Sequence, residues 1–387
     1  MRVIVTGLVG QYAFGGVTWD YLQYVLGFAA LGHDVWYLED TATWAYDPVK
    51  QEPSADCSHN VGYLERVMHE FDLGDRWIYR NEADGFYHGV KDEALAESIL
   101  GEADVLANVS GACWLRPVTA RIPRKLFLDG DPMFTQIGLA TDPESEYAKR
   151  VREHTAHYTF GLNVGQAGCA VPTAGLNWRP TVQPISLDWW RKSLMPASAC
   201  HIADNAWTTV MNWASYKGKE FQGETYGQKD SEFLRFLDLP SSLDERFVLA
   251  MGQGVGKSRP TEMLQSKGWN IIEPDVHLPD YATYHDFLGN SKGEWSIAKN
   301  GYVKSRSGWF SCRSACYLAA GKPVVVQDTG WSDHMPSGEG VLAFSTPEEA
   351  ASAIARVSAD YAHHSEAARL YAEKYFDAAK VCASLLE

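Results

Sequence analysis

Short apolar runs alternate with segments of helical spacing from the start of the chain. Val3–Thr6 is typical of a buried strand, and a glycine-bearing loop, Gly7–Gly16, follows it. Apolar residues then recur at three- and four-residue intervals through Asp20–Leu31, and Gly32 ends this predicted helix. His33–Glu39 is a second predicted strand. Strand, glycine loop, helix and strand in this order predict the opening βαβ unit of a Rossmann-like α/β domain.

The same alternation continues through the first half of the chain. It predicts helices over Val61–Phe71 and Lys91–Leu100 and strands over Asp104–Asn108, Lys125–Leu128 and Tyr158–Val164. Residues 165–184 are rich in Gly, Pro and Thr, and we expect the connection between two domains near Arg179–Trp190. A chain of 387 residues is long enough for two domains, so we place the first at residues 1–185.

The second half repeats the alternation of strands and helices. Strands are predicted at Ala206–Trp213, Phe247–Met251, Trp269–Ile272, Glu294–Ile297, Val324–Val326 and Val341–Phe344. Helices are predicted at Tyr281–Leu288, at Cys312–Ala320 and, after the N-cap Thr346, at Ala350–Val357. These elements predict a second Rossmann-like domain at residues 186–360. In the remaining segment, 361–387, we expect one helix, Ser365–Leu386, that packs back on the first domain.

Composition excludes several classes of protein. The chain has 45% hydrophobic and 21% charged residues, as in soluble globular proteins, and no apolar run approaches transmembrane length. Its formal net charge of −15 argues against a nucleic-acid partner. The seven cysteines are scattered without any C-x-x-C pair, which indicates reduced thiols and no zinc site. The first residues lack the layout of a signal peptide, so we expect a cytoplasmic protein.

A basic segment, residues 291–320, reverses the acidic charge locally. Beside one acid, Glu294, it carries the bases Lys292, Lys299, Lys304, Arg306 and Arg313. Ser311 and Ser314 lie where the helix Cys312–Ala320 should begin. Free N–H groups, hydroxyls and positive charge at a helix N-terminus suit a phosphate or diphosphate. The alternative is a solvated basic face on an acidic protein.

Two other loops bear on the ligand. The loop Gln327–Asp333 leaves the carboxyl end of the strand Val324–Val326, the edge at which open α/β sheets bind ligands. Gly252–Ser258 looks like a phosphate loop but lacks Walker spacing, because Met251 stands at the position of the first Walker glycine. A nucleoside triphosphatase is therefore disfavoured. The absence of G-x-G-x-x-G after the first strand likewise disfavours a nicotinamide cofactor.

The segment Leu318–Val325, LAAGKPVV, resembles the nucleotide-sugar half of GT-B glycosyltransferases of the group 1 type. The pair Gly15-Gly16 and the turn Gly32–Val35 resemble the opening of the same fold. There are departures from the family. Gly308 and Cys316 stand where many retaining members carry a Glu-x7-Glu pair, and Val17 stands where one inverting branch carries a catalytic histidine. The anomeric outcome is therefore left open.

The resemblance implies a GT-B fold, in which two Rossmann-like domains face each other across a deep cleft, and a set of donor contacts. Glu273 is expected near the base and ribose, and Asp328, Thr329, Gly330 and Asp333 near the sugar. Contacts to the donor are further expected from Gly15, Gly16, Lys217, Lys219, Gly252, Gly254, Lys299, Lys304, Arg306, Ser311, Arg313 and Ser314.

Asp129 and Asp131 follow the strand Lys125–Leu128 and allow three interpretations. The pair could hold a divalent metal on a diphosphate, as D-x-D does in the GT-A glycosyltransferases. Asp131 could instead be the general base on an acceptor hydroxyl, with Asp20 or Asp129 as alternatives. Asp129 could also merely start an Asp-Gly turn. We favour Asp131 as the base.

These features together predict a metal-independent glycosyltransferase of the hexosyltransferase type. The expected donor is a nucleotide-diphosphate sugar, a UDP-sugar first of all, and the expected acceptor is a small molecule or glycan. No cofactor is required, and the protein is expected to be a monomer or homodimer. A GT-B nucleotide-sugar epimerase and a non-enzymatic nucleotide- or sugar-binding protein are the alternatives. An aromatic group, Tyr12, Phe14, Trp19, Trp44 and Tyr46, indicates either core packing or a planar or apolar acceptor.

Overall fold

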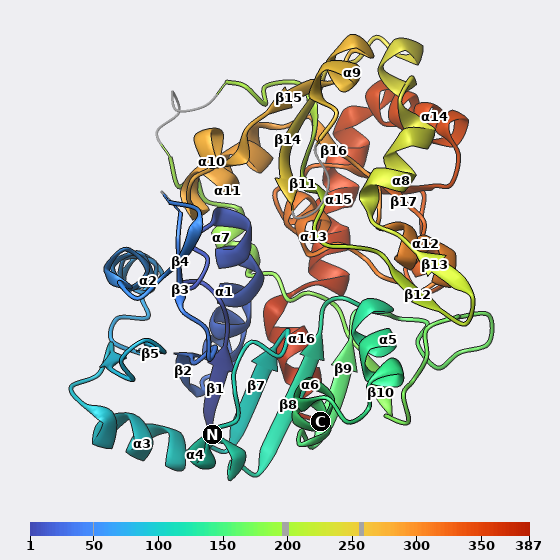
Figure 1. The fold of residues 1–387 in the computed structure, drawn as a ribbon. Coiled ribbons are helices and arrows are strands. Elements are labelled where there is room, and N and C mark those ends of the chain that lie inside the picture. The colour runs from blue at the N-terminus through green and yellow to red at the C-terminus, as the bar shows by residue number, and fades with distance from the viewer. Residues whose placement is uncertain (49, 196–200, 255–258) are drawn as a thin grey trace.

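The computed structural model describes residues 1–48, 50–195, 201–254 and 259–387, which form two halves, each built on a parallel sheet (Figure 1). The first sheet has the strand order β10-β9-β8-β7-β1-β2-β5-β6, in which β5 and β6 pair antiparallel and the other neighbours pair parallel. Its strands are β1 (Arg2–Thr6), β2 (Asp34–Glu39), β5 (Trp77–Arg80), β6 (Tyr87–His88), β7 (Val105–Val109), β8 (Arg124–Asp129), β9 (Ala156–Thr159) and β10 (Trp178–Pro180).

The second sheet is parallel throughout, in the order β15-β14-β11-β16-β17-β18. Its strands are β11 (Trp207–Ala214), β14 (Phe247–Gly254), β15 (Asn270–Ile272), β16 (Gly293–Ser296), β17 (Val324–Gln327) and β18 (Val341–Phe344). The order of the strands reverses between β11 and β16, as it does between β1 and β7 in the first sheet. In doubly wound sheets the carboxyl ends of the strands at such a reversal form the ligand crevice. The predicted α/β architecture is thus confirmed.

Helices cover both sheets. They are α1 (Gly15–Ala30), α2 (Ser58–Glu70), α3 (Glu93–Gly101), α4 (Pro117–Ala120), α5 (Phe134–Thr141), α6 (Glu146–Arg152), α7 (Leu187–Trp190), α8 (Lys229–Phe233), α9 (Thr261–Ser266), α10 (Pro274–His277), α11 (Tyr281–Asn290), α12 (Asn300–Ser305), α13 (Cys312–Ala319), α14 (Pro347–Ala359), α15 (Tyr361–Tyr375) and α16 (Ala378–Leu385), with short 3-10 turns at Leu234–Phe236, Leu239–Ser242 and Trp331–Asp333. Among the described helices, none is long and apolar enough to cross a membrane.

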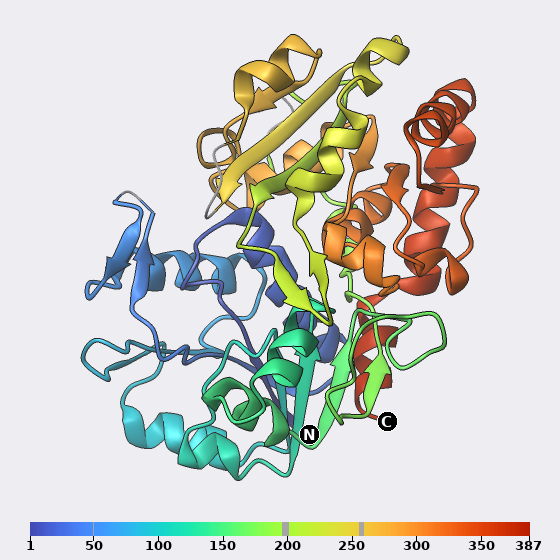
Figure 2. The same ribbon diagram turned by 45° about the vertical axis from the view of Figure 1, so that its right-hand side comes forward.

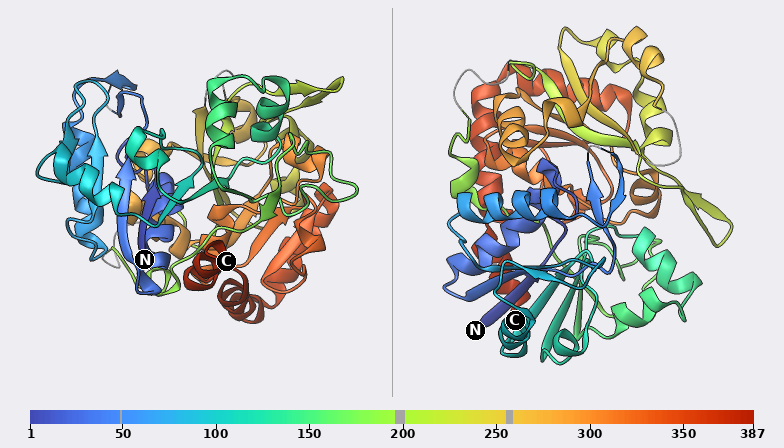
Figure 3. Two further views of the ribbon diagram at one scale, coloured as in Figure 1. Left: turned by 90° about the horizontal axis from the view of Figure 1, so that it is seen from below. Right: turned by 60° about the vertical axis from the view of Figure 1, so that its left-hand side comes forward.

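Burial on both faces explains the apolar runs of the central strands. Val3, Ile4 and Val5 of β1 are fully buried, and so are Val248, Leu249 and Ala250 of β14. In strands covered by helices on both faces, apolar and polar residues need not alternate. A short continuous apolar run therefore predicts such a strand. Both termini lie at the end of the first half that faces away from the second half (Figures 1 and 3).

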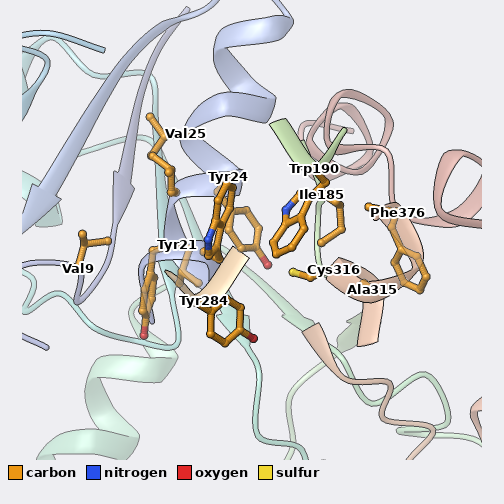
Figure 4. Close-up of a cluster of buried hydrophobic side chains, with 14 of the residues drawn as sticks. Val9, Tyr21, Tyr24, Val25, Ile185, Trp190, Tyr284, Ala315, Cys316 and Phe376 are labelled. Atoms are coloured by element: carbon orange, nitrogen blue, oxygen red, sulfur yellow. The ribbon is translucent and has the colours of Figure 1, made fainter. Parts of the chain in front are cut away.

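Helix α1 lies between the two halves and contacts both. Its first residue, Gly15, comes so close to α11 that a Cβ atom would lie 2.3 Å from the carbonyl oxygen of Asp280. The Trp19 indole donates to the carbonyl oxygen of Tyr281 at 2.9 Å. Fully buried Gln23 accepts at Oε1 from the indole of Trp190 at 3.0 Å. Figure 4 shows part of the shared apolar cluster, in which Tyr24 of α1 lies between Trp190 and Tyr284.

The C-terminal segment corrects one prediction. In place of a single helix over Ser365–Leu386, α15 ends at Tyr375 and α16 begins at Ala378, where Asp377 caps it by accepting from the backbone N–H groups of Ala379 and Lys380. The break changes the direction of the chain, so that α15 packs on α13 in the second half and α16 packs on α1 in the first (Figures 1 and 3). The Arg124 guanidinium also donates to the carbonyl oxygen of Leu386 at 2.6 Å.

One other predicted strand is shorter than expected, and two connecting segments contain regular structure for which no element was predicted. The strand predicted at Tyr158–Val164 ends at Thr159, because the following residues turn toward the second half, where the amide of Asn163 donates to the carbonyl oxygen of Ser307. The basic loop contains a short helix, α12, which ends at Arg306 in the left-handed conformation. The polar loop after β11 forms a hairpin of β12 (Lys219–Phe221) and β13 (Glu224–Tyr226) that reaches toward α5 (Figure 2).

The contact between α1 and α16 generates a stability prediction. A Cβ atom on Gly27 would lie 2.6 Å from the Cys382 sulfur and 2.9 Å from the Ala378 carbonyl oxygen, so Gly27→Ala should destabilise the fold by about 1–3 kcal/mol through overpacking. Gly62, in α2, has only Arg66 near it at 3.9 Å, so Gly62→Ala should stabilise by about 0.5–1 kcal/mol. Thermal unfolding of both variants checks this. Equal midpoints of thermal unfolding for Gly27→Ala and Gly62→Ala would show that α16 does not pack on α1 as described.

Candidate functional site

Two cavities meet at the start of α1 and the start of α13. Cavity A, of about 510 Å3, is lined by the carboxyl ends of β7 and β8 in the first half and by residues of α8, α12 and α13 in the second. Cavity B, of about 370 Å3, is lined by Gly15 and Gly16, by the ends of β11 and β14 at Asn212 and Gly252, and by α10. Asp20, Cys312 and Arg313 line both. The two cavities therefore form one cleft between the halves.

Arg313 reaches the cleft but has a partner within the second half. Its Nε donates to the carboxylate of Glu294 at 2.6 Å, and its Nη1 donates to the carbonyl oxygen of Val210 at 2.7 Å. Glu294 is fully buried and Arg313 is 8% exposed, so the pair is shielded from water. One guanidinium nitrogen, Nη2, is buried without a partner among the described residues. Arg313 thus offers one unused donor but little uncompensated charge.

Lys229, the first residue of α8, is the cation without a partner. It lines cavity A, and no hydrogen bond or ion pair holds it among the described residues. Burial lowers the pKa of Lys229 well below its ordinary value, and the positive charges of Arg313 and Lys299 lower it further. Because Arg313 and Lys299 are each paired with a carboxylate, Lys229 is the basic side chain of this wall whose protonated form a bound anion would stabilise.

The N-terminus of α13 faces the same place. Ser311, the N-cap residue, lines cavity A, and its side chain makes no capping hydrogen bond. The hydroxyl of Ser314, in the first turn, is fully buried and has no partner among the described residues. The first N–H groups of an α-helix have no partner within the helix. Lys229, Arg313 and the N-terminal residues Ser311 and Cys312 of α13 thus all line cavity A, as an anion site would require.

The three candidate carboxylates differ in what already holds them. Asp129 is 2% exposed and accepts from Gln136 at 2.7 Å, from Thr159 at 2.8 Å and from the Asp131 amide at 3.0 Å. Burial raises the pKa of Asp129, and these hydrogen bonds oppose that shift. With both oxygens occupied, Asp129 has a structural role in its turn.

Asp131 joins the two halves. Its carboxylate, from the first half, accepts from Lys299 Nζ at 2.9 Å and from the hydroxyls of Tyr216 and Tyr302, all in the second half. The Lys219 ammonium adds a parallel link by donating to the carbonyl oxygen of Phe134 at 2.9 Å. Three donors on one carboxylate leave it little room to contact an acceptor hydroxyl.

Asp20 is the carboxylate at the junction of the cavities. Burial raises the pKa of Asp20 to about 6, although a hydrogen bond with Cys312 and the charge of Arg313 lower it in part. A pKa near the working pH is that of an effective general base. Asp20 lies three residues after Val17, so both side chains lie on the same face of α1. Both residues line cavity B. Among the three carboxylates, Asp20 best fits the role of proton acceptor.

Several predicted residues lie outside cavities A and B. On the surface, Lys304 pairs with Glu224, and Arg306 pairs with Asp333. Lys217 is exposed, and Gly254 ends β14. The Glu273 carboxylate pairs with Arg259, although the next residues, Pro274 and Asp275, line cavity B. Asp328 accepts from Gly330 and Ser332 within its own turn, and Thr329 donates to the Trp309 carbonyl oxygen. The rest of the glycine loop, residues 255–258, lies outside the described residues.

The aromatic group predicted for the acceptor is divided. Trp19 is 1% exposed and belongs to the core, whereas Tyr12 and Trp44 are exposed and line neither cavity. Phe14 lines cavity B. Three residues of cavity A and its surroundings, Lys229, Tyr216 and Tyr302, are not among those predicted from the sequence. Lys229 could have been found from its place at the start of a helix that follows a hairpin. Nothing in the sequence distinguishes Tyr216 and Tyr302 from the other tyrosines.

Solved structures similar to this chain identify the architecture. HepE of Anabaena, in complex with UDP and glucose, is 11% identical, covers 100% of this chain and 98% of its own, and has a TM-score of 0.56. AviGT4, a glycosyltransferase involved in avilamycin A biosynthesis, is 13% identical, with 100% and 96% coverage and a TM-score of 0.51.

An alpha-glucosyltransferase in complex with UDP and a 13-mer DNA containing an HMU base is 12% identical, with 100% and 98% coverage and a TM-score of 0.55. The chain has the GT-B fold. No protein-family model matches the sequence, and no curated protein matches it. At this identity the similarity to GT-B structures establishes the fold alone. Across the described residues, no group of three or more His, Cys, Asp or Glu side chains is placed to hold a metal ion.

The buried pair Arg313–Glu294 generates a prediction. Arg313→Met should destabilise the protein by about 3–5 kcal/mol, because it leaves the Glu294 carboxylate buried without its partner. Arg306→Met is the matched control. Arg306 and Asp333 are about half exposed, so the loss of that pair should cost about 1 kcal/mol or less. Thermal unfolding of the two variants decides this, and an Arg313→Met variant as stable as the wild type would contradict the pairing.

Proposed function

We propose that this protein is a glycosyltransferase that transfers a hexosyl group from a UDP-sugar to an acceptor hydroxyl. The observation that carries the proposal is the position of Lys229, a side chain without a partner among the described residues, beside Arg313 and the N-terminus of α13 at the strand reversal of the second sheet. A diphosphate satisfies such a site. HepE and the alpha-glucosyltransferase, which share the fold, contain UDP, and this supports UDP as the nucleotide.

The cleft suggests how the donor is divided between the cavities. The nucleoside would occupy cavity B, against the ends of β11 and β14 and Pro274 of α10. The diphosphate would lie at the junction near Arg313, and the sugar would extend into cavity A. Residues 186–360 together with α15 then form the donor domain, and residues 1–185 together with α16 form the acceptor domain.

The chemistry follows from the groups at the junction. The acceptor oxygen forms a bond to the anomeric carbon while the bond from that carbon to the diphosphate oxygen breaks, and its electron pair leaves with UDP. Lys229 and the N-terminus of α13 stabilise the charge that develops on the diphosphate. Asp20 accepts the proton of the acceptor hydroxyl. Because these fixed charges offset the leaving group, we propose that the reaction needs no metal ion.

The first prediction concerns donor binding. Lys229→Met should weaken UDP binding about 10- to 100-fold, because a hydrogen bond to a charged group contributes about 1.5–3 kcal/mol. Lys217→Met removes an exposed lysine that lines neither cavity A nor cavity B, and it should bind UDP like the wild type. Titration calorimetry without metal measures both. Equal affinities of the two variants would remove Lys229 from the donor site.

The second prediction concerns the base. Asp20 must be deprotonated to accept a proton, so kcat/KM should fall tenfold per pH unit below about 6 and level off above it. Asp20→Asn should reduce kcat about 10²- to 10⁴-fold and abolish this pH dependence, while UDP binding persists. A variant that keeps the acid limb or near-normal turnover would assign the base to another group. Calorimetry with UDP is the control for an intact donor site.

A further inference from the structure

The charges that line cavity A are segregated between its two walls. All three basic residues that line it, Lys229, Lys299 and Arg313, come from the second half. All three acidic residues that line it, Asp20, Asp129 and Asp131, come from the first half. Within the described lining, the first-half wall therefore carries no cation at all. A donor on one wall and an acceptor on the other would meet opposite electrostatic environments.

The basic residues are not available to an acceptor. Lys299 is held by Asp131 across the cleft at 2.9 Å, and Arg313 is held by buried Glu294 at 2.6 Å. Lys229 is the remaining basic residue of this lining, and in the proposed function it binds the diphosphate of the donor. A phosphate or carboxylate on the acceptor would therefore lie against the carboxylates of the first-half wall without a cation to pair with it. Burying such a charge without a partner is strongly unfavourable.

The same wall is also poorly suited to a cationic acceptor. Asp129 already accepts hydrogen bonds from Gln136, Thr159 and the Asp131 amide, and Asp131 accepts from two tyrosines and a lysine. Asp20 remains, but it must face the reacting hydroxyl. An ammonium group would compete for the one carboxylate that the chemistry requires.

What the wall offers is hydroxyls and aromatic rings. Ser110, Thr135 and Tyr147 line the first-half side, and the rings of Phe160 and Trp309 close the cavity around them. Trp309 is fixed in place because its indole donates to the carbonyl oxygen of Gly130 at 3.2 Å. Hydroxyls suit a partner that both donates and accepts hydrogen bonds, and ring faces suit the C–H faces of a saturated ring.

We propose that the acceptor is an uncharged, hydroxyl-rich ring, a saccharide or cyclic polyol, and that acceptors with a phosphate or carboxylate next to the reacting hydroxyl are rejected. This proposal rests on the proposed glycosyl transfer and specifies the acceptor for it. It differs from a planar aromatic or lipid acceptor, because polar side chains outnumber rings on this wall.

The test compares matched acceptors on the wild-type enzyme with UDP-glucose at pH 7.5. The panel pairs neutral sugars with their 6-phosphates, their uronic acids and their 2-amino analogues, and UDP release and product mass give kcat/KM for each. We expect neutral sugars to exceed their charged analogues at least 100-fold. Charged analogues that react within tenfold of the neutral sugars would overturn the proposal, and so would transfer to none of the neutral sugars while UDP still binds.

A charge variant makes the test specific to the wall. Ser110→Lys adds a cation to the first-half wall at an exposed residue with φ of 57°, and it should raise the ratio of phosphorylated to neutral acceptor turnover at least tenfold. Gln222→Lys is the matched control, because Gln222 is exposed, has a similar φ of 53° and lies at the tip of the β12–β13 hairpin outside both cavities. An unchanged ratio in Ser110→Lys would contradict the electrostatic argument.

Failure of the proposed function is distinguishable from failure of this inference. If UDP binds neither the wild type nor any variant, glycosyl transfer from a UDP-sugar is wrong and the acceptor proposal falls with it. If UDP binds in a Lys229-dependent way and UDP-glucose is consumed, but the products carry charged acceptors, only the acceptor proposal is overturned.

Discussion

The close contact of α1 with both halves is the constraint on which the rest of the structure depends. Gly15 can approach Asp280 only because it has no side chain, and Trp19 and Gln23 continue the contact along the helix. This contact places the start of α1 opposite the start of α13. Asp20 and Arg313 therefore line the same two cavities although they lie far apart in the sequence. The cleft and its chemistry follow from the packing of this one helix.

A second set of contacts closes the opposite side of the cleft. Asn163 bonds to the backbone of Arg306, Ser307 and Gly330, and Ala170 bonds to Ser305. The link from Asp131 to Lys299, Tyr216 and Tyr302 lies on the same side. Because several sets of contacts join the two halves, the residues that line the cavities are held in place by the protein itself. In a preorganised site of this kind, ligand binding has a smaller entropic cost, because the site residues are already ordered.

The repeating architecture could be predicted from the sequence, but the partners of individual side chains could not. Apolar runs such as Val3–Val5 and Val324–Val326 revealed the strands, because burial on both faces leaves a continuous apolar signal. The sequence reveals the basic segment 291–320, but its basic side chains have different partners in different parts of the structure. Lys304 and Arg306 are paired on the surface and Arg313 is paired in the core, whereas Lys229, which has no partner among the described residues, lies outside that segment. Pairing depends on contacts between distant parts of the chain, which local patterns do not encode.

The break between α15 and α16 has a consequence for how the chain acquires its structure during synthesis. The groove on α1 beside Gly27 is filled by Ala378 and Cys382, which the ribosome adds only after the whole second half has been made. Chains of several domains usually fold from the N-terminus as they emerge, one domain after another. Here the first half emerges early but lacks one of its own helices until the second half has been made. Its apolar groove on α1 stays uncovered for that interval.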